Sequence, residues 1–265
     1  MVSKIIKRLE QLPGKIGFYY ENLNTEDVIF YKDQEPFLAA SVIKLFIMAV
    51  AFEQLERGDY NCKMLFSIKQ KDCVPSCGAL TYLHEGIEVT VMDLITLMII
   101  FSDNTATNVL IEHMGIEEIN TAIKRFGFEK TVLRRKMFDL EKARNGIENY
   151  ITVGEVGKLL KMMYAGTLIS KQASEKMLSI MKNQQLTGKI PFYLKALSHM
   201  PEIAHKTGED MGISHDVGII YGKTPFIVCF CGNETDTPRF ERVMADISLE
   251  LYKVHNSGHE KTDFI

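Results

Sequence analysis

The sequence predicts an α/β (α+β) protein with an antiparallel sheet of about five strands, flanked by terminal helices, and with an inserted all-α lobe. Two observations predict it: β-rich runs lie near both ends of the chain, and the long middle carries apolar residues at helical spacing. Strands at both ends place the two termini in one lobe. We expect a single domain, 1–265, with an α/β lobe from about 1–44 and 196–265 and an all-α lobe from about 45–195.

The first elements are a helix and a hairpin. Residues 1–15, MVSKIIKRLEQLPGK, form an amphipathic pattern with charges throughout and lack the apolar core of a signal peptide. Two β-rich runs follow within residues 15–34, around a turn signal from Asn22 to Asp27. This pattern predicts a β-hairpin.

Residues 39–50, AASVIKLFIMAV, predict a helix that is buried all round. Ser41 and Lys44 lie one turn apart on one face of this helix. Moving an unpaired ammonium out of water is unfavourable by several kcal/mol, or lowers its pKa until the proton is lost. A lysine whose head reaches the surface is the alternative interpretation.

The remaining segments complete the two lobes. Helical periodicity continues through four central segments: 90–115, 115–127, 152–166 and 170–184. Three short strands separated by glycine-containing turns follow, at 203–210, 214–222 and 225–233. A last helix over residues 238–255 should cover the sheet.

Composition excludes several classes of protein. The chain has 265 residues, 46% hydrophobic and 25% charged, with a net charge of −3, so nothing favours binding to nucleic acid or to an anionic membrane. The longest apolar run, residues 37–52, is shorter than the roughly 20 residues of a membrane span and contains Lys44. Five cysteines without a secretory signal favour free thiols and a cytoplasmic location, or export if a leader has been removed. We expect a monomer without metal or organic cofactor, because no cysteine or histidine cluster has ligand spacing.

Three short motifs change the interpretation of Lys44. S-x-x-K lies at 41–44, S-D-N at 102–104 and K-T-G at 206–208. In this order the set resembles the class A β-lactamases and penicillin-binding proteins, whose signature it is. The resemblance extends through residues 80–111, 152–160 and 206–222 and covers most of the chain.

The resemblance implies a β-lactamase/transpeptidase-like fold and a serine hydrolase that opens β-lactam amides through an acyl-Ser41 intermediate. Acyl transfer needs a nucleophile, a base, an oxyanion hole and a proton donor for the leaving group. Ser41 is the candidate nucleophile at a helix N-terminus, where the helix dipole favours negative charge. Desolvated Lys44 is its candidate proton partner, and Ser102 would pass a proton to the leaving nitrogen.

Further roles come from the resemblance alone. Lys206 would hold Ser102 and attract a substrate carboxylate, which Thr207 would also bind, and Asn104 would bind the substrate's side-chain carbonyl. The backbone N–H groups of Ser41 and Glu209 would form the oxyanion hole. Two further residues are interpreted from their type: Gly208 leaves the backbone open to a ligand, and Asp103 is expected to hold its loop.

The chain departs from the family at one point. Class A enzymes carry a glutamate in an E-x-x-L-N motif that activates the deacylating water, and no such motif is present here. Its expected place falls at Met137 or Phe138. The nearest carboxylates, Asp139 and Glu141, are either candidates for this chemistry or simple loop charges.

Three functions therefore stay open. The first is a β-lactamase. The second is a penicillin-binding D,D-peptidase or esterase relative that releases β-lactams slowly, so that the substrate is a β-lactam, a D-alanyl peptide or an ester. The third is a non-catalytic sensor that forms a stable adduct. A Ser-His-Asp triad fits poorly, because no G-x-S-x-G motif is present. Glu209 is unusual beside K-T-G, since its charge would disfavour an anionic substrate unless the side chain points away.

Overall fold

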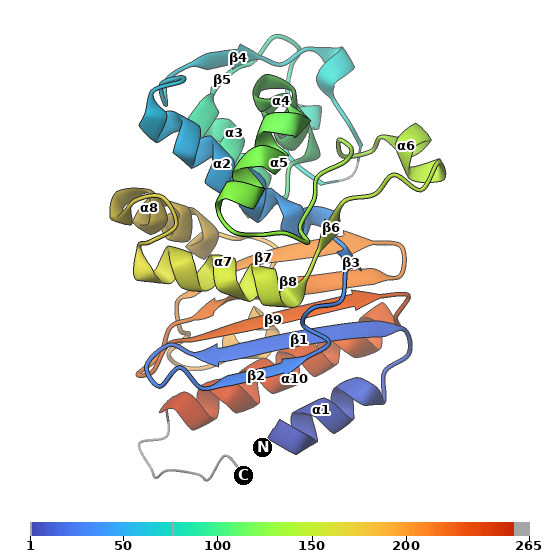
Figure 1. Ribbon diagram of the computed structural model, residues 1–265, viewed down its shortest axis with the longest axis vertical. Helices are drawn as coiled ribbons and strands as arrows, with labels where there is room; N and C mark the ends of the chain where they lie inside the picture. Colours follow the sequence, from blue (N-terminus) through green and yellow to red (C-terminus); the bar gives the residue numbers. More distant parts are fainter. Residues whose placement is uncertain (1, 76, 257–265) are drawn as a thin grey trace.

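A five-stranded antiparallel sheet forms the base of the molecule in the computed structural model, which describes residues 2–75 and 77–256 (Figure 1). The strand order is β2-β1-β9-β8-β7. The strands are β1 (Lys15–Asn22), β2 (Val28–Tyr31), β7 (Ile203–Asp210), β8 (Ile213–Ile220) and β9 (Phe226–Asn233). The predicted antiparallel sheet of about five strands is therefore confirmed, and its three hairpins, β1–β2, β7–β8 and β8–β9, turn where the turn signals lie.

The two ends of the chain meet at the centre of this sheet. Strand β1 pairs with β9 along its whole length, from Lys15 opposite Asn233 to Asn22 opposite Phe226. Such a pairing joins residues more than 200 positions apart in the sequence, so the sheet forms only when both termini are in place.

Helices from the two termini cover one face of the sheet. These are α1 (Val2–Glu10) and α10 (Thr237–Asn256), which lie together below the sheet in Figure 1. Alternate side chains of the strands, such as Phe18 of β1 and Phe230 of β9, are buried against Phe240 of α10. Successive side chains of β1 and β9 thus point alternately into this core and into the core on the opposite face of the sheet.

Two helices from the middle of the chain cover the opposite face. Helix α7 (Val153–Ala165) packs on β1 and β9, and α8 (Lys171–Lys182) packs on β7. The approach of α7 is close, because a Cβ atom at Gly157 would lie 2.4 Å from the ring of Tyr19. Both helices belong to the segment 45–195, so this part of the chain supplies a layer on the sheet as well as the helices above it.

Helix α2 (Lys44–Arg57) is the centre of the upper lobe. It contacts α3 (Val91–Ile100), α4 (Asn104–Met114) and α5 (Ile116–Arg125), and its residues 44–51 are fully buried. The prediction of a helix buried all round is confirmed. None of the described helices combines the length and the apolar character needed to cross a bilayer.

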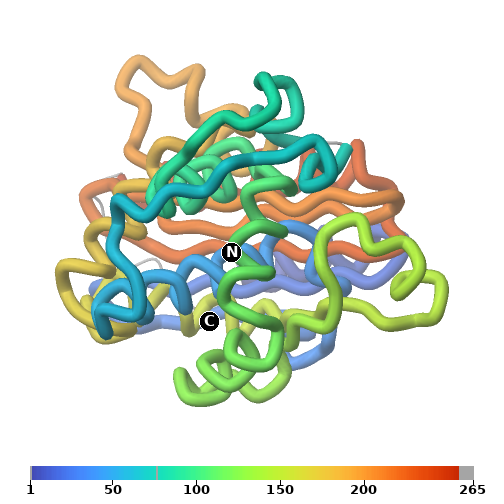
Figure 2. Tube along the Cα trace, turned by 90° about the horizontal axis from the view of Figure 1, so that it is seen from above, coloured from blue at the N-terminus to red at the C-terminus, as the bar shows by residue number. Residues whose placement is uncertain are grey.

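Short elements connect these helices. They are β3 (Phe37–Leu38) with β6 (Tyr150–Ile151), β4 (Leu65–Ser67) with β5 (Glu88–Thr90), α6 (Leu140–Arg144), α9 (Pro191–Leu194) and 3₁₀ turns at Ala40–Ile43, Gln70–Asp72 and Leu80–Tyr82. From above, the loop that carries α6 projects at one side, beside the turn between β7 and β8 (Figure 2). The candidate site lies between them.

Candidate active site

Ser41 lies in a strained 3₁₀ turn and not in the α-helix itself. The turn spans Ala40–Ile43, and α2 begins at Lys44. Ala40 has a φ of 41°, in the left-handed region that residues other than glycine rarely occupy. The turn rests against β7 and β8. Tertiary packing therefore fixes a conformation that presents Ser41, which is partly exposed, at the start of the buried helix.

Ser102 lies at a second strained position, between α3 and α4. Its φ is 55°. The neighbouring Asp103 accepts hydrogen bonds from the backbone N–H groups of Ala79 (2.7 Å), Leu80 (2.9 Å) and Ala106 (2.9 Å). The last of these caps α4. The prediction that Asp103 holds its loop is confirmed.

Lys44 is completely buried, so the interpretation that its head reaches the surface is wrong. Its Nζ donates to the carbonyl oxygen of Ser102 and to Oδ1 of Asn104, both at 2.7 Å, and lies 3.1 Å from Oγ of Ser102. Two carbonyl acceptors match the two N–H donors of a neutral amine and leave its lone pair for a hydroxyl.

The contacts of the described residues include no hydrogen bond between Lys44 Nζ and Ser41 Oγ. The direct Ser41–Lys44 pair that the sequence predicts is therefore not formed in this state. Nζ is bonded instead to Ser102 and Asn104 of the S-D-N motif. Ser41 lies in the 3₁₀ turn that leads directly into α2, which Lys44 begins.

Lys206 completes a row of three polar groups. It is also fully buried, and its Nζ donates to Oγ of Ser102 at 3.1 Å and to the carbonyl of Thr207 at 2.7 Å. The Ser102 hydroxyl therefore lies between two lysines. This arrangement can move a proton from Lys206 through Ser102 to Lys44, or in the reverse direction.

Burial controls the charge of both lysines. Desolvation, and then the positive charge of Lys206, lower the pKa of Lys44 well below that of an ordinary lysine. Burial also lowers the pKa of Lys206 to about 7, although the carboxylate of Asp216 opposes the shift. Burial therefore favours the neutral form of Lys44, while a pKa of about 7 leaves Lys206 partly protonated near neutral pH.

A cavity of about 430 Å³ opens beside Ser41. Its lining comes from the Ser41 turn, from Cys77 and Asn104, from Glu209, Asp210 and Ile213 at the β7–β8 end, and from the loop 135–149. Gly208 takes no part in this lining. A Cβ at that position would lie 3.1 Å from Val42 and from His215, so the glycine makes room for the protein's own packing. Its role toward a ligand stays a prediction.

Asparagines hold the loop 135–149 in place. Asn108 of α4 donates to the carbonyl of Met137 at 2.9 Å and accepts from its N–H at 2.8 Å. Asn149 accepts from the N–H of Arg134 and of Arg135, and its own carbonyl accepts from the N–H of Ala39 at 2.8 Å. The loop is therefore fixed to both sides of the site, and nothing in the sequence pattern marks either asparagine.

Neither Asp139 nor Glu141 lines the cavity. Asp139 caps α6 by accepting from the N–H of Lys142 at 3.1 Å, and Glu141 is exposed. Met137 lines the cavity instead, and so does Phe138. The short helix α6 carries both carboxylates to the projecting end of the loop, where they have the structural roles of loop charges.

Two carboxylates of the cavity, Asp210 and Glu148, carry no signal in the sequence pattern. Glu148 forms an ion pair with Arg135, with Oε2 2.7 Å from Nη2 and 2.8 Å from Nε. Both residues line the cavity. Among the residues that the structure describes, no cluster of three histidine, cysteine or acidic side chains could hold a metal ion.

Comparison with known proteins agrees with this geometry. The family described as "Beta-lactamase enzyme family" matches residues 1–255. The chain belongs to the β-lactamase enzyme family. This family member is 24% identical to β-lactamase ROB-1 of Haemophilus influenzae over 250 residues, which are 92% of this chain and 80% of that protein. The resemblance to class A β-lactamases drawn from the three motifs is confirmed.

Solved structures share the fold of this β-lactamase-family chain. The β-lactamase from Sphaerobacter thermophilus is 26% identical, with a TM-score of 0.87 and 96% of each chain covered. A mutant of PBP-A, solved as an acyl-enzyme complex with penicillin-G, is 24% identical, with a TM-score of 0.84 and coverage of 96% of this chain and 95% of that one.

We predict that Asp103→Ala destabilises the protein by roughly 2–4 kcal/mol, because it removes a cap and two further charge-assisted hydrogen bonds. The control is Asp139→Ala, which removes one partly exposed cap and should lower the free energy of unfolding by about 1 kcal/mol. Urea unfolding followed by circular dichroism measures both. Equal losses in the two variants would contradict the role assigned to Asp103.

Proposed function

We propose that this protein is a serine hydrolase of the class A β-lactamase type, which opens β-lactam amides through an acyl-Ser41 intermediate. One observation carries the proposal. The buried amines of Lys44 and Lys206 both contact the hydroxyl of Ser102, beside a cavity that Ser41 lines. The named β-lactamases among its relatives support the substrate class.

The residues account for the steps of acylation. The Ser41 hydroxyl attacks the lactam carbonyl, and its proton passes to neutral Lys44. The Ser41 hydroxyl and Lys44 Nζ must come within hydrogen-bond reach for this transfer, because Nζ is bonded to Ser102 and Asn104 in the structure. The C–N bond then breaks, and Ser102 delivers its own proton to the lactam nitrogen while it regains one from Lys44. The N-terminus of α2 stabilises the oxyanion.

Acylation is tested by intact-mass measurement over time after mixing with benzylpenicillin. We expect the wild type to gain the mass of the intact drug on the peptide that contains Ser41. Ser41→Ala should show no adduct, and Lys44→Met should acylate roughly 10²-fold more slowly. The control is Ser67→Ala, which alters an exposed serine and should behave as the wild type. An adduct that survives Ser41→Ala would refute the proposal.

The two lysines also predict how acylation depends on pH. Acylation needs neutral Lys44, so its rate rises as pH climbs through the lowered pKa of Lys44. Attraction of a substrate carboxylate needs protonated Lys206, so the rate falls as pH rises through about 7. We therefore expect a bell-shaped profile for the second-order acylation rate constant of benzylpenicillin.

Lys206→Arg should remove the alkaline limb of that profile, because arginine keeps its proton at every pH in the range. The neutral methyl ester of the same drug is the control substrate, and its alkaline limb should be shallower. An alkaline limb near 7 that persists in Lys206→Arg would show that another group titrates there.

The second candidate is a penicillin-binding peptidase or esterase relative that releases β-lactams slowly. A specific observation favours it: Met137 occupies the cavity wall where the family's deacylating glutamate is expected. Glu148 and Glu209, two carboxylates of the lining, are in ion pairs with Arg135 and Lys189. An adduct that persists after excess drug is removed would identify this behaviour.

We predict that Met137→Glu accelerates decay of the acyl-Ser41 adduct by roughly tenfold or more, since it adds a general base for water. Asn108 binds the backbone of residue 137 on both sides, so the new carboxylate should keep the orientation of the methionine. Met137→Gln is the matched control and should not accelerate decay. Decay that is equally slow in both variants would show that this wall does not hold the water.

A further inference from the structure

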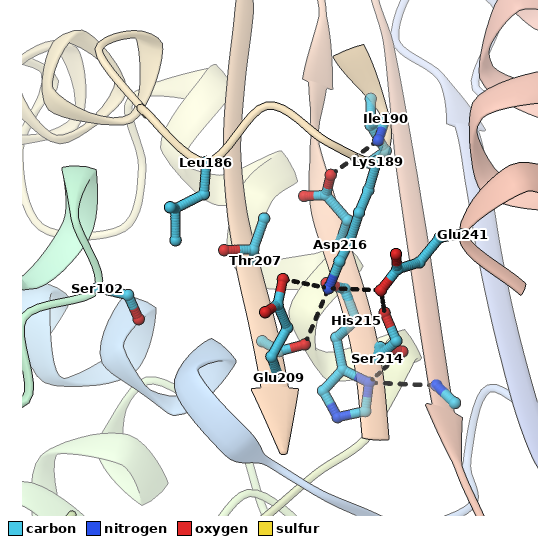
Figure 3. Close-up of polar contacts among 12 residues, drawn as sticks. Ser102, Leu186, Lys189, Ile190, Thr207, Glu209, Ser214, His215, Asp216 and Glu241 are labelled. Carbon is cyan, nitrogen blue, oxygen red and sulfur yellow. Dashed lines mark hydrogen bonds and ion pairs between the residues drawn. The ribbon is translucent and has the colours of Figure 1, made fainter. Parts of the chain in front are cut away.

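Lys189 is a buried cation next to the K-T-G strand that the steps above do not use. It lies in the loop between α8 and α9, and its side chain is 3% exposed. Its Nζ donates to the carbonyls of Gly208 (3.3 Å) and His215 (3.2 Å). Figure 3 shows the side chain extended along β7 and β8, with Nζ between two carboxylates.

The two carboxylates differ in their exposure. Glu209 Oε1 lies 3.0 Å from Nζ and its side chain is 58% exposed, while Glu241 Oε1 of α10 lies 3.6 Å away. Glu241 also accepts from the hydroxyl of Ser214 at 2.8 Å. A buried ammonium needs such partners, because burial without them is strongly unfavourable.

Glu209 is the partner that belongs to the cavity. It directly follows Lys206–Thr207–Gly208 and is among the lining residues, and Asp210 beside it lines the cavity as well. A free carboxylate at this edge would repel the substrate carboxylate that Lys206 and Thr207 are proposed to bind. The ion pair draws the Glu209 side chain toward Lys189 and offsets its charge.

We propose that Lys189 is a positioning residue that lets this site accept anionic substrates, because it holds Gly208 and neutralises Glu209 at the K-T-G edge. The inference rests on the proposed function and names the charge of its substrate. It also answers the question that Glu209 raises in the sequence: the side chain is directed to a buried cation.

The same contacts reach Lys206 electrostatically. The positive charge of Lys189 lowers the pKa of Lys206, whereas Glu209 and Asp216 raise it. Loss of the Lys189 charge should therefore raise the pKa of Lys206 and move the alkaline limb of the acylation profile to higher pH. Loss of the Glu209 charge should move it to lower pH. Simple damage to the fold would not produce these opposite shifts.

A double-mutant cycle tests the proposal, with benzylpenicillin as the anionic substrate and its methyl ester as the neutral one. For Lys189→Met we expect the dissociation constant of the pre-covalent complex to rise about tenfold for benzylpenicillin and to change less than about threefold for the ester. The limiting acylation rate should stay within about threefold for both.

Glu209→Gln supplies the second arm of the cycle. Alone it changes the side chain and keeps the backbone N–H, and it removes a negative charge from the K-T-G edge, so benzylpenicillin should bind at least as tightly as to the wild type. Combined with Lys189→Met it should restore binding of benzylpenicillin to within about threefold of the wild type. Lys195→Met, which alters a more exposed lysine six positions away, is the matched control and should have no effect.

The outcomes separate this inference from the proposed function. Equal weakening of both substrates in Lys189→Met, or failure of Glu209→Gln to restore binding, would overturn the role of Lys189 and leave acyl-Ser41 chemistry intact. A wild type that forms no Ser41 adduct with either substrate would overturn both. If Lys189→Met does not fold, Lys189→Gln removes the same charge, keeps a donor for the two carbonyls, and should give the same pattern.

Discussion

The burial of two lysine amines around one serine hydroxyl is the constraint on which the rest of the site depends. Lys44 and Lys206 are both fully buried, and each lies 3.1 Å from Oγ of Ser102. Two ammonium groups that both contact one hydroxyl oxygen in a desolvated site would repel each other strongly if both carried a full positive charge. Proton loss relieves this conflict, since burial and the charge of Lys206 lower the pKa of Lys44 and so favour its neutral form. A neutral amine is a base, so the same physics that makes the arrangement tolerable makes it reactive.

Holding such an arrangement requires rigid surroundings. Two residues with left-handed backbone lie in the site. Ala40 directly precedes the nucleophile, and the hydroxyl of Ser102 lies between the two lysines. Strain of this kind persists only where neighbouring contacts over-determine it. Asp103 supplies three hydrogen bonds on one side, and Asn108 and Asn149 fix the facing loop on the other. Stability elsewhere in the sheet and in α2 therefore supports a local conformation that the chain would not adopt alone.

Local pattern predicted the elements well, because strand alternation, helical periodicity and glycine turns act over a few residues. The sheet, the buried helix and the break at S-D-N all lie where these patterns indicate. Local pattern does not predict contacts between residues far apart in the sequence. Spacing predicts a pair between Lys44 and its neighbour Ser41, yet Nζ binds a residue 58 positions away. Asp139 and Glu141 are the carboxylates nearest in sequence to the missing glutamate, whereas α6 holds them away from the cavity and Glu148 lines it. No local pattern marks Lys189, because its partners come from β7, β8 and α10.

Charge pairing at the cavity connects substrate preference with turnover. Glu148 forms an ion pair with Arg135, and Glu209 forms one with Lys189. A carboxylate in an ion pair repels an anionic substrate less than a free one does, which favours binding and acylation. Its oxygens are also directed to the cation, so they are less available to a water molecule at the acyl ester. Under the proposed function, these two ion pairs favour binding of an anionic β-lactam, while Met137 lies in the wall at one of the two positions expected for the family's glutamate. On that proposal the same ion pairs help the substrate to enter and delay hydrolysis of its acyl-enzyme, which is the behaviour that Met137→Glu should change.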